Sequence, residues 1–212
     1  RGVSDTRRQD RGHRSAVRAH PVIAAFTVAY IGAFGVYCMA VGIAQYWIYL
    51  GVMAVLMGLV AWVDRRVGLG SGLLAAMSLW GLLHMAGGLV PVERTDQVLY
   101  NVALVPHLLR YDQAVHAFGF GTAAAICWRV LAVRAPGLPA GTTAVAVWLM
   151  GMGLGALNEV VEFVATLVQP ASNVGGYANT AFDLVFNMLG SGAVAVWAGR
   201  RALAEGRAAH AA

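Results

Sequence analysis

Long apolar stretches separated by short polar breaks run along the chain from residue 21 to residue 200. A transmembrane helix needs about 20 mainly apolar residues. The lipid core admits only helices or closed barrels as spanning elements, and these stretches lack the alternation of a strand. The pattern therefore predicts an all-α polytopic membrane protein with six spans, at about 21–44, 46–63, 71–92, 112–133, 141–168 and 178–199.

Composition and charge give this bundle an orientation. The chain is 59% hydrophobic and only 12% charged, which excludes an ordinary soluble domain. With both termini on one side, that side carries thirteen Arg, and the other carries only Arg94 and Arg110. Positive charge favours the cytoplasm. We therefore expect a multi-pass protein of the bacterial cytoplasmic (inner) membrane, with the six-helix domain at 21–200 and cytoplasmic tails at 1–20 and 201–212.

Membrane lipids are the partners that this composition implies. The basic tail 1–20 is expected to fix the topology and to attract anionic lipid weakly. No aromatic-interleaved basic surface accompanies it, so no nucleic-acid partner is expected. Cys38 and Cys127 lie at different depths in apolar spans, and no disulfide is expected between them.

Ionisable side chains interrupt four of the apolar spans. They are His84 in the third, Asp112 and His116 in the fourth, Glu159 and Glu162 in the fifth, and Asp183 in the sixth. A charge at the bilayer centre costs about 2.5–3.5 kcal/mol, and intramembrane charges mark functional sites by default. Since neighbouring spans run in opposite directions, a rise of about 1.5 Å per residue places all of these residues in the outer half. Residues spaced i,i+3 or i,i+4 share a helix face, so we predict one site.

Histidine and carboxylate side chains are ligands suited to Zn, Mn or Fe. The predicted metal ligands are His84, Asp112, His116, Glu159, Glu162 and Asp183, and the predicted catalytic groups are Glu159 and Glu162. Five further residues are expected to hydrogen-bond to the ligands or to a substrate: Tyr111, Asn158, Tyr177, Asn179 and Asn187. Metal-activated water at such an outward-facing site could hydrolyse a lipid or envelope substrate.

Two other hypotheses fit the same residues. Clustered carboxylates and histidines also form proton relays and ion sites in proton- or ion-coupled transporters, and Glu159 and Glu162 could share one proton. In a non-catalytic accessory subunit of a membrane complex, Asp112 would cap its helix and Asp183 would pair with His116 to hold helices together. This hypothesis implies a membrane-protein partner.

The segment 93–111 is half apolar, too short to span the membrane and interrupted by Pro106. We expect it to lie at the membrane interface over the polar site, where it could act as a lid. His107 within it is expected to be an exposed loop residue.

Several of these residues form a pattern that resembles known families. The pattern comprises His84 with Gly87-Gly88, Tyr111-Asp112 with His116, Asn158-Glu159 with Glu162, and Gly176-Tyr177 with Asn179-Thr180, Asp183 and Asn187. It resembles the YjdF-like inner-membrane proteins and, more distantly, the VanZ-like family, over roughly residues 80–195. The resemblance implies the fold, the topology and the site residues, but no reaction. Gln113 stands where the family pattern has Arg, so the charge compensation would differ here.

Overall fold

The computed structural model describes residues 20–95, 97–168 and 176–211. Six helices in these residues are long and apolar enough to cross a membrane. They are α3 (Pro21–Val41), α4 (Tyr46–Val67), α5 (Gly70–Leu89), α6 (Tyr111–Arg134), α7 (Ala140–Val168) and α8 (Tyr177–Ala211). The predicted all-α, multi-pass fold is thus confirmed. Most of the predicted tail 1–20 lies outside the described residues.

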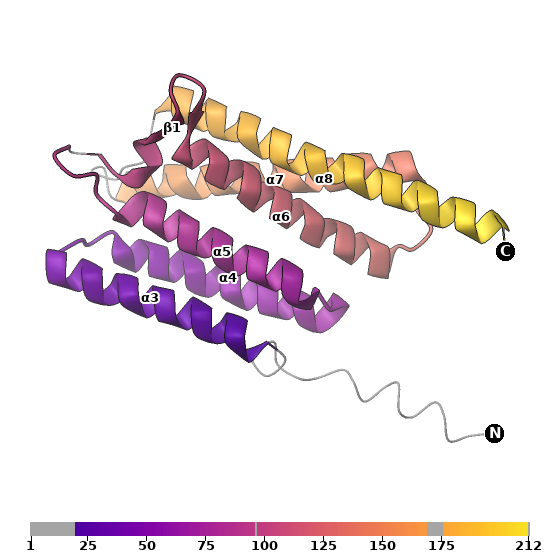
Figure 1. Ribbon diagram of the computed structural model, residues 1–212, viewed down its shortest axis with the longest axis horizontal. Coiled ribbons are helices and arrows are strands. Elements are labelled where there is room, and N and C mark those ends of the chain that lie inside the picture. The colour runs from indigo at the N-terminus through magenta and orange to yellow at the C-terminus, as the bar shows by residue number, and fades with distance from the viewer. Residues whose placement is uncertain (1–19, 96, 169–175, 212) are drawn as a thin grey trace.

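The helices form two groups (Figure 1). In one group α5 packs on α3 and α4; in the other α8 packs extensively on both α6 and α7. Contacts between α5 and α6 join the groups, through a buried cluster that includes Trp80, Val115 and Phe120. Large apolar side chains on α3 and α4 face outward, among them Val28 and Val55, which are 68% and 71% exposed. The bundle therefore contacts lipid along its sides.

Local backbone chemistry ends two helices earlier than the hydropathy pattern predicts. Gly42 adopts a left-handed conformation (φ 81°) and its N–H bonds to the carbonyl of Cys38, so α3 ends at Val41 and not near 44. Val90 is extended ahead of Pro91, which ends α5 at Leu89 and not near 92.

The last helix is longer than predicted. Hydropathy placed its end near 199, but α8 continues to Ala211. Arginine and alanine are good helix formers, and Arg201 pairs with Glu205 one turn later at 3.0 Å. The predicted cytoplasmic tail is therefore largely a helical extension, because loss of hydrophobicity marks the end of the apolar zone and not the end of a helix.

The segment between α5 and α6 is more ordered than the predicted loop. It contains a 3-10 turn, η1 (Leu99–Asn101), and an antiparallel hairpin of β1 (Ala103–Val105) and β2 (Leu109–Arg110). His107 is exposed at the hairpin turn with φ 59°, as the predicted loop position implied.

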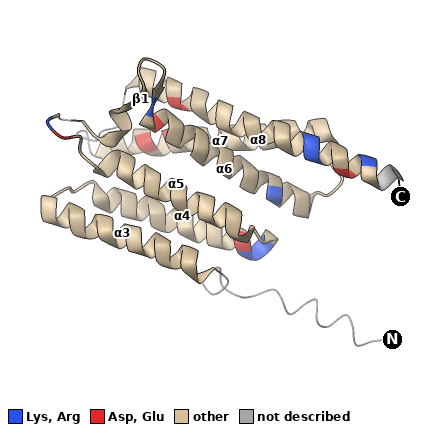
Figure 2. Ribbon diagram, in the orientation of Figure 1, with Lys and Arg blue, Asp and Glu red and all other residues tan. Residues whose placement is uncertain are grey.

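Charged residues divide between the two ends of the bundle (Figure 2). One end holds the start of α3, the end of α8 and most of the described arginines: Arg65, Arg66, Arg129, Arg134, Arg200, Arg201 and Arg207. The other end holds the hairpin and most of the described acids: Glu93, Asp112, Glu159, Glu162 and Asp183. We call these the arginine end and the acidic end.

Candidate functional site

Polar side chains from three helices meet inside the acidic end. The first turns of α6 bring Asp112 and His116, the later turns of α7 bring Glu159 and Glu162, and the first turns of α8 bring Asp183 and Asn187. Gly155 of α7 makes the approach of α8 possible, since a Cβ there would lie 2.7 Å from the amide nitrogen of Asn187. Asn187, which is fully buried, consequently reaches across to His116 on α6.

Asp112, His116 and Asp183 form the first group of possible metal ligands. One ligand atom from each lies within 4.8 Å of the others. The amide nitrogen of Asn179 donates to Oδ2 of Asp112 at 3.2 Å and to Oδ2 of Asp183 at 2.5 Å. Because Asp183 is only 1% exposed and His116 only 3% exposed, little water reaches this group.

His116 lies between Asn187 and Asp112. Its Nδ1 lies 3.0 Å from Oδ1 of Asn187, and its Nε2 lies 3.5 Å from Oδ1 of Asp112. With the imidazole proton on Nδ1, the lone pair of Nε2 and the carboxylate oxygen of Asp112 are two acceptors that face each other in a buried site. They then need a metal ion or a proton between them.

His116, Glu159 and Glu162 form a second group on the other side of the ring. Oε1 of Glu159 lies 3.7 Å from Nδ1 of His116. Asn158 donates to Oε1 of Glu162 at 2.7 Å, whereas both carboxylate oxygens of Glu159 are buried without a hydrogen-bond partner among the described residues. A buried carboxylate without partners is costly, so Glu159 needs a proton, a cation or a bound donor.

His84 lies outside both groups, contrary to the predicted ligand set. The rings of His84, Trp80, Phe120 and His116 pack in series with centroid separations of 5.7 Å, so two aromatic rings stand between the two histidines. The hydroxyl of Tyr100 donates to the backbone carbonyl of His84 at 2.9 Å and lies 2.5 Å from Nδ1.

Tyr49 and Tyr100 pack around His84, and neither was among the predicted site residues. A Cβ on Gly87 would overlap the ring of Tyr100, and one on Gly88 would overlap the hydroxyl of Tyr49. The Gly87-Gly88 pair was therefore the available signal. It indicates close packing but does not say which rings fill the space.

The residues expected to support the site divide into two sets. Asn158, Asn179 and Asn187 hydrogen-bond directly to candidate ligands. The hydroxyl of Tyr111 instead donates to the carbonyl of Leu83 at 3.0 Å and so joins α6 to α5. Tyr177 is 90% exposed at the start of α8, so the structure does not bring it to the site.

The absence of Arg at position 113 has a structural consequence. Oε1 of Gln113 accepts the backbone N–H of Arg110 at 2.8 Å and so caps the start of α6. Arg110 itself stands at the start of α6, two residues before Asp112.

Comparison with known proteins returned one result. The family model described as "Predicted membrane protein (DUF2238)" matches residues 20–203. No curated protein and no solved structure matches the chain.

Proposed function

The chain belongs to the DUF2238 family of predicted membrane proteins, and we propose that its acidic end binds a divalent metal through Asp112, His116 and Asp183. The site would face outward from the bacterial cytoplasmic membrane and would hydrolyse a lipid or envelope substrate. The resemblance to YjdF-like and VanZ-like proteins is part of this proposal and supports the choice of residues.

The position of the His116 ring is the observation that carries the proposal. Its Nδ1 lies 3.0 Å from Oδ1 of Asn187, and its Nε2 faces Oδ1 of Asp112 at 3.5 Å. Asn179 holds both carboxylates of the group in place. A ring N–H bonded to a neighbouring oxygen, with the other nitrogen turned toward acidic ligands, is the arrangement usual for a metal-binding histidine.

The donor set of one imidazole and two carboxylates suits Zn, Mn or Fe. A divalent metal bound there supplies Lewis-acid chemistry and an acidic bound water. Glu159 is the chain's candidate proton acceptor. It lies on the Nδ1 side of His116 with both oxygens free of hydrogen-bond partners among the described residues, so it would accept a proton through the imidazole ring and not directly from the Nε2 side. Asn158 donates a hydrogen bond to the neighbouring Glu162, so the two carboxylates have different surroundings and would have different roles.

The orientation and the substrate class have separate support. Most of the described arginines gather at the end opposite the site, which by the positive-inside rule would be cytoplasmic. Leu104, Val105 and Leu108 are exposed on the hairpin beside the site, where they could enter the lipid interface. A substrate that reaches the site from the outer leaflet or the envelope is consistent with both.

Metal content tests the proposal. Three purified proteins would be equilibrated with Zn, Mn and Fe in turn: the wild type, Asp183→Ala and Glu159→Ala. Their metal content would then be measured by inductively coupled plasma mass spectrometry. We expect one metal ion per chain in the wild type, a loss of at least about tenfold in affinity in Asp183→Ala, and retention in Glu159→Ala.

Glu93→Gln is the matched control, because Glu93 is an exposed acid at the same end of the bundle. It should bind metal as the wild type does. A wild-type protein without stoichiometric metal under all three conditions would sink the metal hypothesis.

Proton or ion coupling is the second candidate function. The carboxylate of Glu159, which lacks a hydrogen-bond partner among the described residues, favours it. If a second imidazole proton neutralises the contact between His116 and Asp112, the same residues form a proton-binding site without metal. A metal-free wild type that takes up protons from the outer side in proteoliposomes, and loses this uptake in Glu159→Gln, would support that function.

A further inference from the structure

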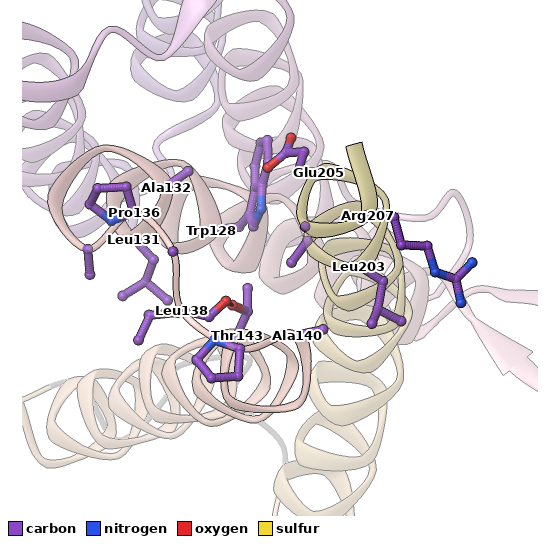
Figure 3. A pocket seen from close by; sticks show the side chains of 15 residues that line it. Trp128, Leu131, Ala132, Pro136, Leu138, Ala140, Thr143, Leu203, Glu205 and Arg207 are labelled. Atoms are coloured by element: carbon purple, nitrogen blue, oxygen red, sulfur yellow. Dashed lines mark hydrogen bonds between the residues drawn. The ribbon is translucent and has the colours of Figure 1, made fainter. Parts of the chain in front are cut away.

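A cavity of about 750 Å³ lies at the arginine end, away from the candidate site. Its walls come from the last turns of α6, the connection to α7 and the extension of α8 (Figure 3). The side chains of Trp128, Leu131 and Leu138 give the walls an apolar character, while Glu205 and Arg207 belong to the extension of α8. Its lining is thus amphipathic.

The length of α8 sets the depth of this cavity. The helix has 35 residues, and at about 1.5 Å per residue it is longer than the hydrocarbon core, which is about 30 Å thick. The residues of α8 that line the cavity, Ala202–Arg207, lie in the last third of the helix. They therefore fall at the level of the lipid head groups and glycerol backbone, if α8 begins at the opposite membrane surface.

We call two residues the arginine rim: Arg207, which lines the cavity, and Arg201, which contacts the lining residues Trp128 and Glu205. The guanidinium of Arg201 lies 5.1 Å from the ring centroid of Trp128 and 5.8 Å from that of Trp197. Its Nε also lies 3.0 Å from a carboxylate oxygen of Glu205, and both side chains of this pair are largely exposed. An anionic ligand could therefore compete with Glu205 for Arg201.

We infer that this cavity binds an anionic phospholipid, with its glycerol and upper acyl chains against the apolar walls and its phosphate at the arginine rim. Basic pockets between helices on the cytoplasmic side recognise anionic head groups in this way. The charge of this end also argues against the chain's own N-terminal tail as the occupant. Residues 1–20 carry six Arg against two Asp and would be repelled by the arginines here.

Native mass spectrometry of the full chain in detergent tests the inference. The probes are dioleoyl phosphatidylglycerol, dioleoyl phosphatidylcholine with the same chains, and glycerol phosphate without chains. We expect retention of one phosphatidylglycerol, at least about fivefold tighter than phosphatidylcholine. Glycerol phosphate should be retained weakly, because the apolar walls contribute to binding.

Three variants separate charge from fit. Arg207→Gln should weaken phosphatidylglycerol binding by about fivefold, and Glu205→Gln should strengthen it by up to about fivefold, because Arg201 is released. Leu203→Trp should weaken both lipids by filling the cavity. The control is Arg66→Gln, which removes one positive charge at the same end of the bundle, 5.4 Å from Trp62 and outside the cavity.

Equal retention of the two lipids, or equal losses in Arg207→Gln and Arg66→Gln, would overturn the inference. So would binding of glycerol phosphate as tightly as phosphatidylglycerol, which would indicate a site for a free anion. None of these readouts depends on metal at the acidic end, so this inference and the proposed function can fail independently.

Discussion

The two helix groups use glycine for different purposes. Between α6 and α8, glycines bring backbones together: a Cβ on Gly190 would overlap the carbonyl oxygen of Ala117, and one on Gly121 would lie 3.2 Å from the carbonyl of Gly190. Gly119, also on α6, instead accommodates the ring of Trp80. In the group α3–α4–α5, glycines accommodate large side chains, as Gly35 does for Tyr46 and Gly88 for the hydroxyl of another tyrosine.

This difference explains where the polar site lies. Short side chains such as Asp183, Asn187 and Ser191 can bridge helices only where the backbones are close, and all three are almost fully buried. Where aromatic rings separate the helices, a short carboxylate cannot reach a neighbour. The carboxylates and His116 therefore meet in one group, while His84 is enclosed by rings in the other.

Gly190→Ala should have the largest effect on stability. The added Cβ meets backbone, which no side-chain rotation can relieve, so α6 and α8 must separate. We expect a loss of about 3 kcal/mol in the free energy of unfolding, measured by thermal or chemical unfolding in detergent. Metal binding should weaken in parallel, because its ligands come from both helices.

The matched control is Gly192→Ala, on the same helix two residues later. Its Cβ would lie 3.7 Å from the indole of Trp148, an ordinary contact, so stability should be unchanged or slightly higher. Equal losses in the two variants would mean that glycine flexibility, and not backbone proximity, determines the effect.

Asp183→Asn should change stability in opposite directions with and without metal. Without metal, the change removes one of several clustered carboxylates while keeping an oxygen that can accept from Asn179. We expect the metal-free protein to gain about 1–2 kcal/mol and the metal-equilibrated protein to lose relative to wild type. Unfolding curves recorded with chelator and with Zn measure both signs, and a change of one sign in both would contradict a metal at Asp183.

Much of this comparison was visible in the sequence. Hydropathy predicts the spans, and the opposite directions of successive spans predict a shared depth for the polar residues. On that basis Asp112, His116 and Glu159 were expected at one level of the membrane. Depth in the membrane could not show that His84 lies apart from these residues. The direction in which its side chain points around the helix axis depends on which rings fill the spaces beside Gly87 and Gly88. The same limit applies to Tyr177, since a residue at a helix start can turn outward.

Side-chain pairings were the least predictable part. The segment 93–111 read as an irregular interfacial stretch because its apolar positions follow no helical or strand period for long. Its hairpin depends on pairing across a turn at His107, and its contact with α5 depends on Tyr100. Both are non-local interactions that composition does not encode.

Gly88→Ala should cost less than Gly190→Ala, and a second change should rescue it. The added Cβ overlaps only the hydroxyl end of Tyr49, which Tyr49→Phe removes. We expect a loss of about 1–2 kcal/mol for the single variant and a favourable coupling of about 1 kcal/mol in the double-mutant cycle. Absence of coupling would contradict the side-chain role of glycine in this group.

Tyr100→Phe should have the smallest effect at neutral pH. The variant loses the hydrogen bonds to His84, at a cost of about 1 kcal/mol. Burial, followed by nearby negative groups, raises the pKa of Tyr100 well above its usual value. The folded protein therefore keeps this proton more tightly than the unfolded chain, and stability should decline as the pH rises above about 10, where an unfolded tyrosine ionises.

Unfolding measured between pH 8 and 11 separates this contribution from the others. In Tyr100→Phe the decline should become shallower by the contribution of one proton, so that the deficit relative to wild type narrows as the pH rises. Tyr177→Phe makes the same change at an exposed tyrosine and should leave the stability unaltered. If stability declined with pH as steeply in Tyr100→Phe as in the wild type, the buried hydroxyl beside His84 would not hold its proton. The aromatic enclosure of His84 described above would then be wrong.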